Sequence, residues 1–155
     1  MNNVEIQAVF QSAEQPSEQQ IQLWVDTALA DIDHDTEIVV RIVDEVESAE
    51  LNQQYRHKQG ATNILSFPVE IPEGIDLELD LLGDLVVCAP VLAQEAELQN
   101  KILAHHWAHI IIHGVLHLLG YDHLDDEQAE EMESKEIALL QKLNINNPYE
   151  QVGDQ

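Results

Sequence analysis

Three histidine residues, His113, His117 and His123, stand at the spacing H-x3-H-x5-H in the chain. Residues four apart share one face of a helix, so His113 and His117 are expected to project together. Gly120 lies where a left-handed C-terminal cap would end that helix, which allows the chain to turn back and bring His123 to the same point. Three neutral imidazoles with one open position are the ligand set of a catalytic zinc site, whereas structural zinc usually has four protein ligands. The spacing therefore predicts one bound metal ion, with Zn2+ as its expected identity.

The same spacing fits the H-E-x-x-H-x-x-G-x-x-H pattern of metzincin peptidases except at one position. Gly114 stands where a peptidase has its general-base Glu, so nothing at that place can move a proton between water and a leaving amine. Phosphodiester cleavage depends more on stabilising charge on the phosphoryl oxygens, which a metal ion and an arginine can provide. The missing Glu argues against a peptidase, and a zinc metallopeptidase with a distant base stays as the weaker alternative.

Four further polar residues surround the motif. The stripe of residues four apart drifts by about 40° per step, so His105 is expected to lie off the metal face. His109 is expected either to hydrogen-bond to a metal ligand or to be a polar residue at the edge of a buried helix. His106 is predicted to lie at the surface. Asp122 either orients a ligand imidazole or accepts backbone N–H groups in the turn.

The length of 155 residues and the 45% hydrophobic content predict one compact domain over residues 1–155, with a polar C-terminal tail from about residue 147. The longest uncharged apolar run, at 85–93, is far shorter than the roughly 20 residues of a membrane span. The first ten residues lack the basic and apolar regions of a secretion signal, so we expect a cytoplasmic protein. Cys88 is the only cysteine, which excludes an internal disulfide and a cysteine-based zinc site.

The charge of the chain is strongly acidic. Thirty Asp and Glu residues against six Lys and Arg residues give a net charge of −24. Such a field repels nucleic acid in bulk, and it either favours basic protein partners or simply keeps the chain soluble. Any action on nucleic acid must therefore depend on a local feature.

Apolar periodicity predicts alternating strands and helices. We expect strands at 4–10, 37–43, 63–69 and 81–88 and helices at 17–30, 48–55, 90–99, 102–119 and 125–143. Ser17 and Ser48 are the expected N-caps of the first two helices. The pair Gly83–Asp84 inside a strand indicates a bulge or a close backbone approach. The pattern predicts an α+β fold, a mixed four-stranded sheet covered by helices.

The block HGVLHLLGYDH at 113–123, preceded by HWAH, resembles the YbeY family of metal-dependent endoribonucleases, which act in ribosomal RNA maturation. Two upstream blocks agree: LNQQYRHKQGATNILSFP at 51–68 and LLGDLVVC at 81–88. The resemblance covers roughly residues 43–136. It implies an α+β fold in which the three histidines hold one metal ion, usually zinc, in a cleft. It also implies a functional arginine before the LSFP strand, which falls on Arg56.

The residues around Arg56 give this implication independent support. Arg56 and Lys58 are two of only six cations, and a guanidinium can donate two parallel hydrogen bonds to a phosphate. A solvated loop arginine is the simpler explanation for Arg56 taken alone. The loop departs from the family pattern, because His57 replaces a Gly and Gly60–Ala61 replace a Lys-Pro pair, so it lacks a cation and a rigid proline.

The sequence thus predicts a single-strand-directed, metal-dependent endoribonuclease of ribosomal RNA processing and ribosome quality control. In this hypothesis His113, His117 and His123 hold the metal, and Arg56 is the catalytic residue that stabilises developing charge. The expected partners are ribosomal RNA and basic ribosomal proteins, with neither membrane nor DNA. The alternative is a non-enzymatic ribosome assembly factor with a structural metal. The nucleophile and the general base do not follow from the sequence.

Overall fold

The computed structural model describes residues 1–12, 14–69 and 80–149 of the chain. The elements follow one another as β1 (Asn2–Ala8), α1 (Glu18–Ala28), β2 (Thr36–Val43), α2 (Glu45–Arg56), β3 (Ile64–Pro68), β4 (Asp80–Cys88), α3 (Ala89–Leu98), α4 (Leu103–Leu118) and α5 (Asp126–Lys142). The structure contains every strand and helix that the sequence predicted. The largest difference between a predicted and an observed boundary lies at the start of α2, which begins at Glu45 instead of Ser48.

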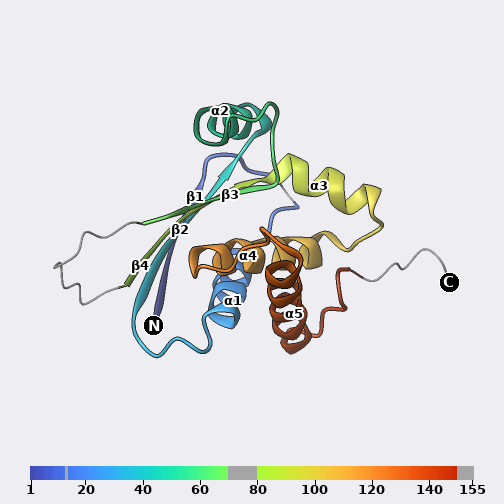
Figure 1. The fold of residues 1–155 in the computed structure, drawn as a ribbon. Helices are drawn as coiled ribbons and strands as arrows, with labels where there is room; N and C mark the ends of the chain where they lie inside the picture. The colour runs from blue at the N-terminus through green and yellow to red at the C-terminus, as the bar shows by residue number, and fades with distance from the viewer. Residues whose placement is uncertain (13, 70–79, 150–155) are drawn as a thin grey trace.

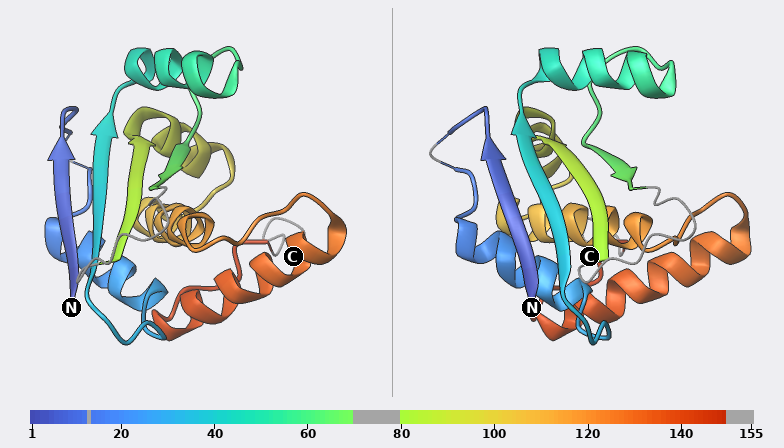
Figure 2. Two further views of the ribbon diagram at one scale, coloured as in Figure 1. Left: turned by 60° about the vertical axis from the view of Figure 1, so that its left-hand side comes forward. Right: turned by 90° about the vertical axis from the view of Figure 1, so that its left-hand side faces the viewer.

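The strands form one mixed sheet in the order β1-β2-β4-β3 (Figures 1 and 2). β1, β2 and β4 run parallel, and β3 pairs with β4 in the antiparallel direction. β2 lies inside the sheet, and its β-branched residues Ile38, Val40 and Ile42 are buried at every second position. The predicted α+β fold with a mixed four-stranded sheet is confirmed.

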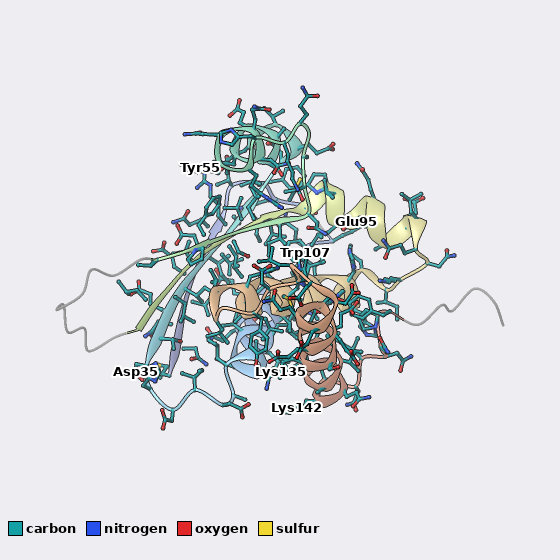
Figure 3. All side chains as sticks on the ribbon, in the orientation of Figure 1. Asp35, Tyr55, Glu95, Trp107, Lys135 and Lys142 are labelled. Carbon is teal, nitrogen blue, oxygen red and sulfur yellow. The ribbon has the colours of Figure 1, made fainter. Side chains whose placement is uncertain are left out.

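Helices cover both faces of this sheet. Leu85 and Val87 of β4 lie in the main core with residues of α1, α4 and α5, whereas Val86 and Cys88 lie in a second core with Leu51 of α2. Figure 1 shows α2 on one side of the sheet and α1, α4 and α5 on the other. Trp107 of α4 is buried between the sheet and the helices (Figure 3). None of the described helices combines the length and the apolar character needed to cross a membrane.

Of the two predicted N-caps, one is confirmed and the other is wrong. Ser17 caps α1 through a capping box, because its hydroxyl accepts the N–H of Gln20 and the Gln20 side chain accepts the N–H of Ser17. The assignment of Ser48 as a cap is wrong. Asp44 caps α2, and Ser48 is buried inside this helix, where its hydroxyl bonds to the backbone N–H and C=O of Thr62 at 3.0 Å each.

Gly83 marks a close approach between β4 and β3, as the sequence predicts. Its φ is +138°, and a Cβ at this position would lie 2.2 Å from the backbone oxygen of Phe67. The register of β4 against β2 also shifts just before Gly83. Only a residue without a side chain fits here, because the neighbouring atom is backbone and cannot rotate away.

We expect Gly83→Ala to lower the free energy of unfolding by about 3 kcal/mol or more, because backbone strain and overlap add. Gly60→Ala is the matched control. Gly60 also has a positive φ, +87°, but its Cβ would meet nothing within 4 Å. Strain alone should cost this control about 1–2 kcal/mol. Urea unfolding of both variants measures the difference, and equal losses would show that the contact with Phe67 is unimportant.

Candidate metal centre

Helix α4 positions the first two histidines of the motif. Its buried residues run from His106 to Leu118, so the helix is held between the sheet and the other helices. The helix ends in a Schellman motif, in which the N–H of Gly120 donates to His117 and the N–H of Tyr121 donates to Leu116. Gly120 has a φ of +104°, which agrees with the predicted glycine cap. This turn redirects the chain toward His123.

The three imidazoles converge. The candidate ligand nitrogens of His113, His117 and His123 all lie within 4.8 Å of one another, the one such group of His, Cys, Asp or Glu found among the described residues. The Nε2 atoms of His113 and His117 are 3.1 Å apart. Two nitrogens bound to a tetrahedral zinc ion at about 2.0–2.1 Å would lie roughly 3.3 Å apart. The spacing of this pair and the all-nitrogen donor set therefore fit a zinc ion.

The electrostatics of the group favour the neutral imidazoles that a metal requires. Burial lowers the pKa of His117, and the neighbouring His113 and His123 lower it further. Asp122 and a hydrogen bond with the backbone of Tyr121 act in the opposite direction. Asp122 itself accepts the backbone N–H of His123 at 2.8 Å, which is the turn role that the sequence left as one of two alternatives.

A buried acid, Glu136 of α5, lies behind the histidine group and was not predicted. Its Oε1 is 2.8 Å from Nδ1 of His113 and 3.0 Å from Nε2 of His109, and its Oε2 accepts the Tyr149 hydroxyl at 2.7 Å. Burial alone would raise the pKa of Glu136, but the hydrogen bonds with His109 and His113 lower it to about 2. The sequence signal that could have identified Glu136 is its position among the apolar residues that form the buried face of α5, namely Met132, Leu139 and Leu140.

Helix α4 carries three further histidines, His105, His106 and His109. His109 is buried and bonds to Glu136, which in turn bonds to His113, so it belongs to the network behind the group. The prediction that His106 lies at the surface is wrong. His106 is 4% exposed and its Nε2 lies 2.9 Å from Oε1 of Glu95 on α3, because α3 covers this side of α4. His105 is half-buried and lies outside the three-histidine group.

Arg56 is the last residue of α2 and is exposed. Its guanidinium makes no ion pair or hydrogen bond with the rest of the described chain, and none of the described contacts joins it to the three histidines. His57, where the family pattern has Gly, caps α2 in the left-handed conformation with a φ of 57°. A positive φ favours glycine, the residue that the resemblance implies at this place.

Two contacts connect the end of α2 with α4 through β3. The ring of Tyr55, next to Arg56, packs edge-on against Phe67 with centroids 5.1 Å apart. The hydroxyl of the adjacent Ser66 donates to the carbonyl oxygen of Gly114 at 3.4 Å. The arginine-bearing end of α2 and the histidine-bearing part of α4 therefore both contact strand β3.

These features together define an α+β protein of one mixed sheet with a three-histidine group suited to a metal ion. A family model described as Endoribonuclease YbeY matches residues 4–144. The chain belongs to the endoribonuclease YbeY family, which confirms the family predicted from the sequence motifs.

Two relatives have the name Endoribonuclease YbeY. The protein of Colwellia psychrerythraea is 52% identical over 150 residues, which cover 94% of this chain and 96% of the relative. The protein of Nitrosococcus oceani is 49% identical over 149 residues, which cover 96% and 97% of the two chains. A solution structure of a Thermotoga maritima protein covers 100% of both chains at a TM-score of 0.62 and 24% identity, and this likeness concerns the fold.

Gly114, the position of the absent peptidase glutamate, faces the sheet. A Cβ there would lie 2.6 Å from Cδ1 of Ile64 and 2.8 Å from Cδ2 of Leu85. Both side chains belong to the main core, where close packing makes the required shift of either one costly. The glycine allows α4 to lie close to the sheet, and a glutamate would not fit.

We expect Gly114→Ala to destabilise the protein. Alanine in an open helix interior would stabilise it by about 1 kcal/mol, whereas overpacking a core costs about 1–3 kcal/mol, so a net loss of about 1 kcal/mol should remain. Chemical denaturation measures the sign. A gain of stability would show that the core yields at this point and that close helix–sheet packing does not explain the glycine.

Proposed function

We propose that the chain is a single-strand-directed, metal-dependent endoribonuclease, a hydrolase of ribosomal RNA processing and ribosome quality control. It works in the cytoplasm as one domain over residues 1–155, of which the last six lie outside the described part. The observation that carries the proposal is the convergence of His113, His117 and His123 in a chain whose relatives are named endoribonucleases.

Each proposed site residue has a separate role. His113, His117 and His123 would hold one zinc ion, and their nitrogen donors and spacing support this assignment. A bound zinc ion supplies Lewis-acid chemistry to phosphoryl transfer. Arg56 would donate paired N–H groups to a phosphate and stabilise the charge that develops on it. Its exposure and its freedom from described acidic partners support that role.

The distribution of charge limits how RNA can bind. Two of the six basic side chains, Arg41 and Lys135, already form ion pairs with Glu47 and Asp31. Tight binding of a bare polynucleotide normally needs several Lys or Arg contacts to phosphates. With a net charge of −24, the chain is better suited to basic protein surfaces. We therefore propose ribosomal RNA as the substrate and basic ribosomal proteins as the partners that bring the enzyme to it.

Two substitutions test catalysis against a purely structural metal. Arg56→Ala should lower cleavage of single-stranded RNA by about 100-fold, because it removes a donor to developing charge, and should leave the melting temperature unchanged. His117→Ala should abolish both zinc binding and cleavage. Lys142→Ala is the matched control, since Lys142 is an exposed cation and its loss changes the net charge equally.

The contrary result would be equally clear. If the wild type left single-stranded RNA uncut, and His117→Ala acted only through a lower melting temperature while Arg56→Ala had no effect, the chain would be an assembly factor with a structural metal. Cleavage that persists in the wild type after complete removal of metal by a chelator would overturn metal dependence.

Free RNA should bind weakly, and its affinity should fall steeply with salt, because few cations are available to contact phosphates. Fluorescence anisotropy with a labelled single-stranded RNA at several salt concentrations measures this dependence. Addition of purified ribosomal subunits should recruit the protein under conditions in which the RNA alone does not. Nanomolar binding of naked RNA in physiological salt would contradict delivery by basic partners.

A further inference from the structure

Glu136 is a buried carboxylate with neither a Lys nor an Arg partner among the described residues. It is 1% exposed, and its partners are two imidazoles, His109 and His113, and the phenol of Tyr149. Neither Lys nor Arg pairs with it in the described part of the chain. A buried charge is costly unless it is hydrogen-bonded and compensated by an opposite charge. The hydrogen bonds are present, and a divalent ion bound to the neighbouring histidines would supply the opposite charge.

The hydrogen bonds of Glu136 determine which nitrogen of His113 can bind a metal. An ionised carboxylate only accepts hydrogen bonds, so the 2.8 Å contact places a proton on Nδ1 of His113. The lone pair is then on Nε2, the atom that lies 3.1 Å from Nε2 of His117. A carboxylate behind a histidine in this way fixes the tautomer and ring orientation of a metal ligand.

Two other groups hold Glu136 in place. Nε2 of His109 is 3.0 Å from Oε1, and the Tyr149 hydroxyl donates to Oε2 at 2.7 Å. The same hydroxyl is 3.2 Å from Nε2 of His109, so the three side chains form one closed network. His109 comes from α4, Glu136 from α5 and Tyr149 from the segment after α5, so the network ties the end of the described chain to the histidine group.

We propose that Glu136 is the positioning residue of the metal centre, which orients His113 and provides the buried negative charge that a divalent cation compensates. His109 and Tyr149 hold the carboxylate in this position. The inference rests on the metal binding in the proposed function, and it assigns to α5 and to the segment after it a part in holding the ion.

Zinc affinity without RNA is the direct test. Metal-free wild type, Glu136→Gln and Glu130→Gln are titrated with Zn2+ in competition with a chromophoric chelator. Glu136→Gln should weaken zinc binding by about 10–100-fold, as removal of such a carboxylate does elsewhere. Glu130→Gln, an exposed acid on the same helix, changes the net charge equally and should bind like the wild type. Equal affinities for wild type and Glu136→Gln would overturn the inference.

A spectroscopic readout separates positioning from a merely structural role. Imidazole nitrogen resonances of the metal-free protein, recorded well above the ordinary imidazole pKa, should show His113 protonated at Nδ1 in the wild type and redistributed toward Nε2 in Glu136→Leu, which has no hydrogen-bond acceptor. The same tautomer in both proteins would overturn the inference. Tyr149→Phe keeps the carboxylate and removes one donor, so it should weaken zinc binding by only a few-fold and retain the Nδ1 proton.

The outcomes distinguish this inference from the proposed function. If wild-type protein bound no zinc, the proposed metal dependence would fail for every variant alike. If wild type bound zinc and cleaved RNA while Glu136→Gln bound zinc equally well, only the role of Glu136 would fail.

Discussion

The close packing of α4 against the sheet is the constraint on which the rest of the structure depends. The helix is buried along most of its length, and Gly114 lets its backbone approach Ile64 and Leu85 so closely that a methyl group would overlap them. A helix fixed in this way cannot rotate, so the direction of every side chain on its last turns is determined. His113 and His117 are therefore oriented by the core, and only His123 depends on the loop that follows.

A buried helix that carries several histidines must provide a partner for each of them. His106 pairs with Glu95 of α3, and His109 and His113 share Glu136 of α5. Buried polar groups are rarely left without hydrogen bonds, since each unsatisfied group costs about 1–3 kcal/mol. The acids of the neighbouring helices therefore stabilise the packing of α3 and α5 on α4. The hydrogen bond between Glu136 of α5 and His113 also orients the imidazole of His113.

Apart from the mixed four-stranded sheet, the features predicted correctly from the sequence are those that depend on local geometry. The capping box of Ser17, the left-handed Gly120 and the close approach at Gly83 follow from short segments alone, as does the convergence of histidines four residues apart. The errors concern tertiary neighbours. Ser48 resembles an N-cap until Thr62 is known to lie beside it, and His106 resembles a surface residue until α3 is placed. Glu136 could be recognised only as an acid on an apolar stripe, because its two histidine partners are 23 and 27 residues distant.

The net charge of the proposed metal centre follows from its three histidines and from Glu136 behind them. Neutral imidazoles add no charge, so on the proposed assignment a divalent ion beside one buried carboxylate leaves a single net positive charge at the group. Arg56, exposed and unpaired within the described residues, would add a second on the far side of β3. Both positive charges would act locally in a chain that is strongly acidic as a whole. The acidic chain as a whole would repel RNA, so the proposed function requires that other molecules deliver the strand to these local positive charges.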